Sequence, residues 1–134
     1  MKILLIDTVP KTMAVALVSC NNVVQRCQEM TPEAKHDRSV IPLVNEVMTQ
    51  AGVSFADINA YAVNVGPGGF TGPRIGVSVV KAFALVHPRP IIVLNTFDVE
   101  AVCAKFTAGN FTPIEELEPA YNGEYVVTVK KPSA

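Results

Sequence analysis

The sequence lacks several features that would place its 134 residues in a specialised class of protein. It contains no tryptophan, and its three cysteines, Cys20, Cys27 and Cys103, are odd in number and form no C-x-x-C pair. Neither a disulfide framework nor a zinc site is therefore indicated. The first apolar run, from Ile3 to Ile6, ends at Asp7 and is too short for a signal segment or a membrane span. We expect a cytoplasmic protein without membrane contact.

An excess of charge of either sign is also missing. Eleven basic residues stand against twelve acidic ones, and the formal net charge is −1. A protein that binds nucleic acid by itself usually carries a basic patch, which displaces counterions from the phosphates. We therefore expect any contact with RNA to be shared with another protein. The hydrophobic content of 49% is sufficient for the core of one ordinary domain without metals or disulfides.

Hydrophobic periodicity predicts both the type and the order of the secondary-structure elements. Strands are expected at residues 2–7, 13–19, 23–30, 58–65 and 90–94, and helices at residues 39–51, 73–87 and 96–106. The turn residues Val9-Pro10-Lys11 and Asn21-Asn22 indicate that the first three strands form an antiparallel meander. The order βββαβαβα predicts an α/β domain in which helices pack on a mixed sheet. This is also the order that opens the ribonuclease H-like, actin-type ATPase fold.

Local signals predict where the helices begin and end. Pro42 is expected in the first turn of the first helix, where its missing N–H group has no helical partner to lose. Gly52 follows this helix as a stop signal, and Thr96 is placed to cap the third helix. After Gly109 the periodicity fades, so no further element is predicted.

The glycine-rich segment 66–74 joins a predicted strand to a predicted helix. Glycines at such a junction either let an anion approach backbone N–H groups or allow a sharp turn with close packing. A Walker A loop requires Lys and Ser or Thr after its last glycine, but Pro73-Arg74 follow Gly72. A dinucleotide-binding fingerprint would need glycine in place of Thr71. The spacing therefore favours a structural or interface role over phosphate binding.

Nucleotide binding stays open as an alternative, and it would use Asp7, Gly68 and Gly69. An acidic residue at the end of the first strand holds a metal-bound phosphate in actin-type ATPases. In those enzymes the following hairpin contains glycine, whereas the hairpin here, residues 8–12, has none and includes Pro10, which lacks an N–H donor. A buried, hydrogen-bonded structural role for Asp7 is therefore favoured.

The two histidines do not form a metal or hydrolase motif. A metal pair on the first helix would need a second ligand four residues after His36, and that position is Val40. His87 is expected at a helix end, and neither histidine belongs to a nucleophile motif. We expect no metal site, no cofactor and no catalytic residue.

Three segments of the sequence carry a resemblance to a known family. The first is residues 2–8, KILLIDT, and the second is His36 leading into residues 41–44, IPLV. The third, GPGGFTGPRIG from Gly66 to Gly76, is similar to the pattern GPGSFTGxRIG and is the most specific of them. In this order and spacing, the segments resemble the landmarks of the TsaB family.

The resemblance covers roughly residues 1–108, which would form an actin-like N-terminal half. Typical members of the family continue into a second half, whereas residues 109–134 would be a short C-terminal remnant or tail. Within that tail, residues 118–121 resemble the usual end of the family, as though most of the second half were deleted. The glycine-rich motif departs from the pattern at Gly69, where serine is usual, and at Pro73, where an aliphatic residue is usual.

The resemblance implies a partner protein rather than an enzyme. Proteins of the TsaB family bind the catalytic subunit TsaD, which transfers threonylcarbamoyl to the adenosine next to the anticodon of tRNA; the ATPase TsaE joins them. The two helices that follow His36 and Phe70 would form the contact with TsaD. Alone, these proteins form homodimers through the same helices, and tRNA is contacted only through the complex. The partner interface is then expected to include Pro42, Val44, Val47, Met48, Phe70, Thr71, Pro73, Arg74, Ile75, Val79 and Phe83.

Two other functions remain as alternatives to the partner subunit. The chain could be an actin-type nucleotide-binding enzyme that uses Asp7 and the glycine-rich segment. It could also be a degenerate domain that only forms homodimers. Nucleotide binding by the isolated chain would favour the enzyme, whereas capture of a TsaD-like protein would favour the partner subunit.

Overall fold

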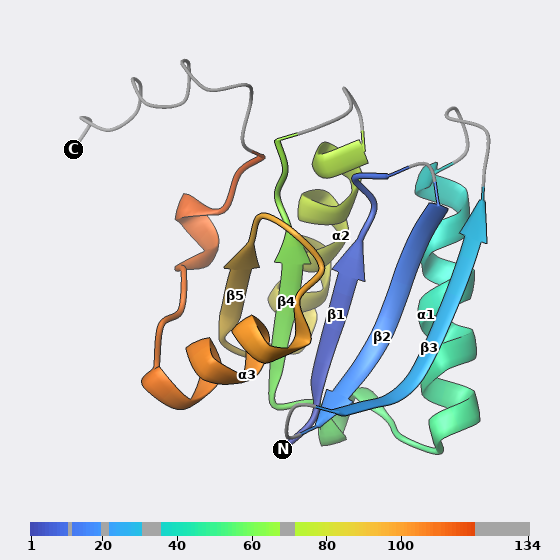
Figure 1. The fold of residues 1–134 in the computed structure, drawn as a ribbon, viewed down its shortest axis with the longest axis horizontal. Helices are drawn as coiled ribbons and strands as arrows, with labels where there is room; N and C mark the ends of the chain where they lie inside the picture. Colours follow the sequence, from blue (N-terminus) through green and yellow to red (C-terminus); the bar gives the residue numbers. More distant parts are fainter. Residues whose placement is uncertain (11, 20–21, 31–35, 68–71, 120–134) are drawn as a thin grey trace.

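A computed structural model describes residues 1–10, 12–19, 22–30, 36–67 and 72–119 of the chain. Its centre is a five-stranded sheet in the order β3-β2-β1-β4-β5 (Figure 1). The strands are β1 (Ile3–Asp7), β2 (Thr12–Ser19), β3 (Asn22–Met30), β4 (Ala60–Asn64) and β5 (Ile91–Leu94). The helices are α1 (His36–Ala51), α2 (Gly72–Val86) and α3 (Val99–Ala108), with the short 3-10 helices η2 (Phe55–Asp57) and η3 (Ile114–Glu116).

The sheet is mixed, as the sequence predicts. β1 pairs antiparallel with β2, and β2 pairs antiparallel with β3, so the first three strands form the expected meander. β1 also pairs in parallel with β4, and β4 pairs in parallel with β5. Because parallel strands end at the same edge of a sheet, the residues that follow β1, β4 and β5 come together there.

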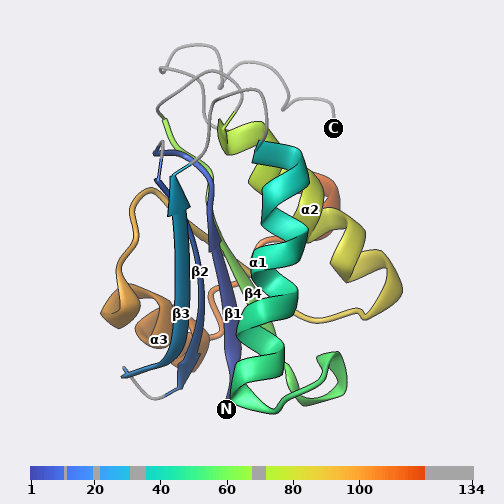
Figure 2. The same ribbon diagram turned by 90° about the vertical axis from the view of Figure 1, so that its right-hand side faces the viewer.

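The helices cover opposite faces of the sheet (Figure 2). Helices α1 and α2 lie side by side on one face, and α3 lies on the other. The central strand β1 is buried on both faces, because successive side chains point to opposite sides. Leu4 and Ile6 join the core beneath α1 and α2, whereas Ile3 and Leu5 join the core beneath α3. This is why the strand is apolar throughout rather than alternating.

The structure corrects two predicted helix ends. Helix α1 begins at His36, three residues before the predicted start, so Pro42 lies inside the helix and not in its first turn. The helix therefore lacks one backbone donor at this position. Helix α3 is capped by Asp98 and not by Thr96, because the Asp98 side chain accepts a hydrogen bond from the Ala101 N–H at 3.1 Å.

The segment after α3 packs against the same domain. Gly109 ends the helix in the left-handed conformation, with φ of 71°, which glycine adopts without steric cost. The Thr112 N–H then donates to the Ile91 carbonyl at 2.8 Å, and Leu117 is buried among the core residues beneath α1 and α2. No helix in the described part of the chain has the length and apolar character needed to span a bilayer.

Candidate partner interface

The outer surface of the α1–α2 layer contains a groove of about 310 Å³. Its walls are α1, the connection from α1 to β4, and the second half of α2. The lining residues are Ile41, Val44, Asn45, Met48 and Thr49 of α1, Val53, Ser54 and Phe55 of the connection, and Phe83 of α2. Most of these side chains are apolar, and Ile41 at the edge of the groove is 48% exposed. An apolar groove that leaves an aliphatic side chain partly exposed is typical of a surface that binds another protein.

Aromatic contacts hold the α2 wall of the groove against the connection from α1. Phe55 meets Phe83 edge to face, with ring centroids 5.0 Å apart. Phe55 also stacks on His87, with centroids 5.1 Å apart and an angle of 8° between the rings. These contacts join residues from segments far apart in the sequence, so the shape of the groove depends on tertiary packing.

The end of α2 is fixed to the sheet below it. The Tyr61 hydroxyl donates a 2.7 Å hydrogen bond to the carbonyl of His87, which immediately follows the helix. Burial raises the pKa of this hydroxyl, and the positive charge of Arg89 opposes only part of the rise. The hydroxyl therefore stays protonated and available as a donor at neutral pH. Arg89 Nε donates to the Ile58 carbonyl at 2.7 Å and anchors the same region.

The expected interface residues of α1 differ in how far they are exposed. Pro42 is exposed, and Val44 and Met48 are 3% and 5% exposed but line the floor of the groove. Val47 is completely buried against the sheet and offers no surface to a partner, so it belongs to the core and not to the interface. The apolar spacing of an amphipathic helix predicts which side chains face the core, and Val47 is one of these side chains.

The expected interface residues of α2 also differ in exposure, and some of them are not described. Arg74 is exposed, and Ile75, Val79 and Phe83 are partly buried against the core. The side chain of Pro73 is not among those described, and the predictions for Phe70 and Thr71 fall outside the described residues.

Sequence reasoning missed several apolar residues that line the groove or are exposed at the end of α2. Ile41, Val53 and Phe55 border the groove, and Leu85 and Val86 at the end of α2 are 75% and 71% exposed. Ile41 stands three residues before Val44, so helical spacing could have found it. No sequence signal brings Phe55 to the groove, because its position depends on its contacts with α2.

The edge formed by the ends of β1 and β4 contains the residue proposed as a nucleotide ligand. Asp7 is 4% exposed, and its Oδ1 accepts hydrogen bonds from the Val9 N–H and from Asn64 Nδ2, both at 3.1 Å. These bonds support the structural role of Asp7 that the sequence favours. The other proposed ligands, Gly68 and Gly69, lie outside the described residues.

Close packing explains one glycine of the motif. The Gly76 N–H donates to Thr8 Oγ1 at 3.0 Å, and a Cβ atom on Gly76 would lie 2.9 Å from the same oxygen. It would also lie 3.3 Å from a methyl group of Val63. Glycine at this position therefore lets α2 approach β1 and β4 closely.

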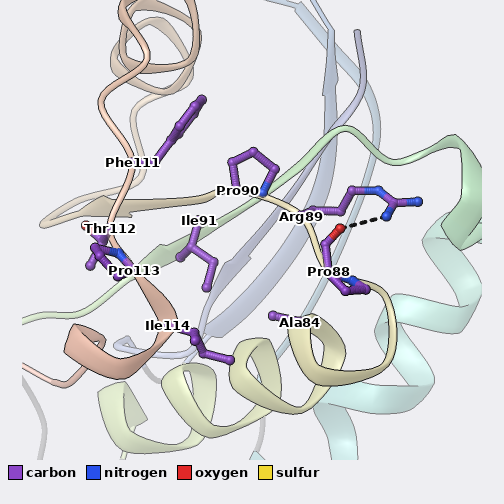
Figure 3. Close-up of a pocket in the computed structure, with 9 residues that line it drawn as sticks. All are labelled: Ala84, Pro88, Arg89, Pro90, Ile91, Phe111, Thr112, Pro113 and Ile114. Carbon is purple, nitrogen blue, oxygen red and sulfur yellow. Dashed lines mark hydrogen bonds between the residues drawn. The ribbon is translucent and has the colours of Figure 1, made fainter.

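A second pocket, of about 430 Å³, also lies near the C-terminal end of α2 (Figure 3). It is lined by Ala84 of α2, by Pro88, Arg89, Pro90 and Ile91 on the way into β5, and by Phe111, Thr112, Pro113 and Ile114 after α3. Its one charged side chain, Arg89, already donates to the carbonyls of Ile58 and Pro88 at 2.7 Å. Across the part of the chain that the structure describes, no three His, Cys, Asp or Glu residues are grouped as metal ligands.

The strand order, the antiparallel meander and the placement of helices on both faces define an α/β domain with the actin-like ATPase fold. A family model described as TsaD, tRNA N6-adenosine threonylcarbamoyltransferase, matches residues 18–119. The chain therefore belongs to this family, and within it the chain is a homologue of TsaB, also called YeaZ.

Individual relatives agree with this assignment. The tRNA threonylcarbamoyladenosine biosynthesis protein TsaB of Escherichia coli K12 is 38% identical over 96 residues, which are 72% of this chain and 41% of that protein. A tRNA N6-adenosine threonylcarbamoyltransferase from Bradyrhizobium sp. strain BTAi1 is 37% identical over 65 residues, 48% of this chain and 18% of the enzyme.

A solved structure, YeaZ from Pseudomonas aeruginosa, superposes with a TM-score of 0.66 at 30% identity. The superposition covers 81% of this chain and 50% of the YeaZ chain. The chain thus spans half or less of the length of these relatives.

Proposed function

We propose that the protein is a non-catalytic partner subunit in the biosynthesis of threonylcarbamoyladenosine in tRNA. In this role it binds a TsaD-like catalytic subunit and supports its activity. The observation that carries the proposal is the apolar groove between α1 and α2, which lies on the two helices that the TsaB resemblance assigns to the partner interface. The similarity to TsaB of E. coli supports a role in the biosynthesis of threonylcarbamoyladenosine in tRNA.

The groove has the anatomy of a protein-binding site. Its buried part combines Val44, Met48 and Phe83, and its exposed lining includes the polar side chains of Asn45 and Thr49. An apolar centre with a polar rim is the usual arrangement of protein interfaces, because the centre gains from desolvation while the rim stays hydrated. We propose that an apolar side chain of the partner enters this groove.

The remaining partners follow from the same proposal. A TsaE-like ATPase joins the complex, and the protein alone forms a homodimer through the α1–α2 face. Transfer RNA is bound only through the complex, which fits the net charge of −1. The assembly works in the cytoplasm. Residues 1–108 then correspond to the N-terminal half of a TsaB-type protein.

Ile41→Glu tests the proposal directly. Ile41 is half exposed, so the substitution introduces a charge at the groove and not in the core. Val44→Glu would instead place the charge in the core. Desolvating an unpaired charge at an interface is costly, and affinity for the TsaD-type transferase of the same organism should fall at least about tenfold. Ala104→Glu, at an exposed position on α3 across the sheet, is the matched control.

Calorimetric titration with the transferase, and light scattering of the protein alone, provide the two measurements. We expect Ile41→Glu to weaken both the heterodimer and the homodimer, and Ala104→Glu to weaken neither. If the wild-type chain forms a homodimer but does not bind the transferase, the degenerate dimeric domain is the better description. Equal binding by both variants would exclude the groove as the interface.

A further inference from the structure

The peptide groups around Gly66 are held by two asparagine side chains, one at the end of β4 and one directly after β5. The Gly66 N–H donates to Asn64 Oδ1 at 2.9 Å, and the Gly66 carbonyl accepts from Asn95 Nδ2 at 2.6 Å. Asn64 is the last residue of β4, and Asn95 directly follows β5. Gly66 has a φ of 92°, a conformation that favours glycine. Both polar backbone groups of this residue are thus fixed where the chain leaves the sheet.

Asn64 is itself fixed by a third strand. Its Nδ2 donates to Asp7 Oδ1 at 3.1 Å, and the side chain is only 4% exposed. An asparagine accepts through one end of its amide and donates through the other, so it joins a backbone N–H to a carboxylate. An aspartate at the same position is an acceptor only and would place two carboxylates in contact. The amide is therefore required by the partners on both of its sides.

Gly66 is the first residue of the glycine-rich segment. Only residues 67–71 separate Gly66 from the first residue of α2, Gly72. At the other end of this region the Gly76 N–H is bound to Thr8 Oγ1 at 3.0 Å. The chain is therefore attached to the sheet at Gly66 and again at Gly76, and the first turn of α2 lies between these attachments.

We infer that Asn64 and Asn95 are positioning residues, which set the start of α2 and with it the partner-binding face. The predicted effect on partner binding rests on the proposed function, because the first turn of α2 carries Arg74 and Ile75, two residues of the expected interface. The positioning itself is a property of the isolated chain. Asn95 is exposed, so its bond to Gly66 contributes to local geometry more than to the core.

Asn95→Asp is the sharpest variant, because it preserves the size of the side chain and removes its donor. The control is Asn110→Asp, which introduces the same charge at an exposed position after α3. We expect Asn95→Asp to reduce affinity for the TsaD-type transferase of the same organism by roughly 5- to 30-fold, and Asn110→Asp to leave it unchanged. The midpoint of urea unfolding should change little in either variant.

Backbone amide resonances of the isolated chain give a readout that does not need the partner. Asn95→Asp should shift the resonances of Gly66, Ile75 and Gly76, whereas Asn110→Asp should not. Asn64→Asp should shift the same resonances, since it replaces the amide donor to Asp7 with a second carboxylate.

The affinity for the transferase and the amide resonances together distinguish the positioning role from the proposed function. If the wild type does not bind the transferase but the resonances shift as stated, the proposed function fails and the positioning role stands. If the wild type binds and Asn95→Asp binds equally well, with unshifted resonances, the positioning role is overturned while the proposed function survives. Shifts of Gly66, Ile75 and Gly76 together with weaker binding would support both.

Discussion

The rings of Phe55 and Phe83 pack edge to face, with centroids 5.0 Å apart and an angle of 61° between their planes. Phe55 belongs to η2, between α1 and β4, and Phe83 belongs to the second half of α2. Both rings line the groove on the α1–α2 face. This contact therefore ties the shape of the candidate interface to the packing of α2 on the sheet.

A double-mutant cycle should detect this contact as a coupling between the two rings. Edge-to-face aromatic pairs contribute about 0.5–1.5 kcal/mol beyond the area that they bury. We expect Phe55→Leu and Phe83→Leu each to lower the free energy of unfolding, and the double variant to lose less than the sum by about that amount. Urea unfolding followed by circular dichroism measures all four proteins. Additive losses within about 0.3 kcal/mol would show that the rings are not coupled.

Gly76→Ala should destabilise the protein although alanine favours helices. The new Cβ would lie 2.9 Å from Thr8 Oγ1, and Thr8 is completely buried, so either the Thr8 side chain or the helix must shift. Overpacking of this kind typically costs about 1–3 kcal/mol. The matched control is Ser78→Ala, at an exposed position of the same helix, which should change stability by less than about 0.5 kcal/mol. A gain near 1 kcal/mol for Gly76→Ala, as helix propensity alone predicts, would contradict the close approach.

Tyr61→Phe should lower stability at neutral pH, because it leaves the His87 carbonyl without the 2.7 Å hydrogen bond from the hydroxyl. The expected loss is about 1 kcal/mol. Burial raises the pKa of Tyr61 in the folded state, so the wild type loses stability as the pH rises above about 10, where the unfolded chain ionises first. The phenylalanine variant lacks this contribution.

The difference in stability between the wild type and Tyr61→Phe should therefore become smaller at alkaline pH. Thermal unfolding of both proteins between about pH 7 and pH 11 measures it. A difference that stays constant over this range would mean that Tyr61 ionises equally easily in the folded and unfolded chains.

The isolated protein should bind tRNA only weakly. With eleven basic and twelve acidic residues, it has no excess of positive charge to displace counterions from phosphates. We expect a dissociation constant no tighter than about 1 μM near 0.15 M salt. Filter binding with unmodified tRNA, alone and with the TsaD-type transferase added, provides the measurement. Submicromolar binding by the chain alone would show that it contacts tRNA without the complex.

The fold was predictable to a large extent, because it depends on local patterns. The apolar run at residues 3–6, the helical spacing after Ser39 and the glycine-rich junction each identify an element from neighbouring residues. The candidate interface was less predictable. Val44 and Val47 share one apolar stripe in the sequence, but only Val44 reaches the groove, whereas Val47 lies entirely beneath the helix.

The amino-acid sequence by itself determined the order of strands and helices, the mixed sheet and the family resemblance, since periodicity and a specific motif are properties of short segments. Only the tertiary structure decided which side chains remain at the surface and which distant ones meet. Asn95 reaches Gly66 across the edge of the sheet, and Phe55 reaches Phe83 between two elements. Contacts of this kind depend on how elements pack, and the helical or strand period of one segment does not specify the partner that will cover it.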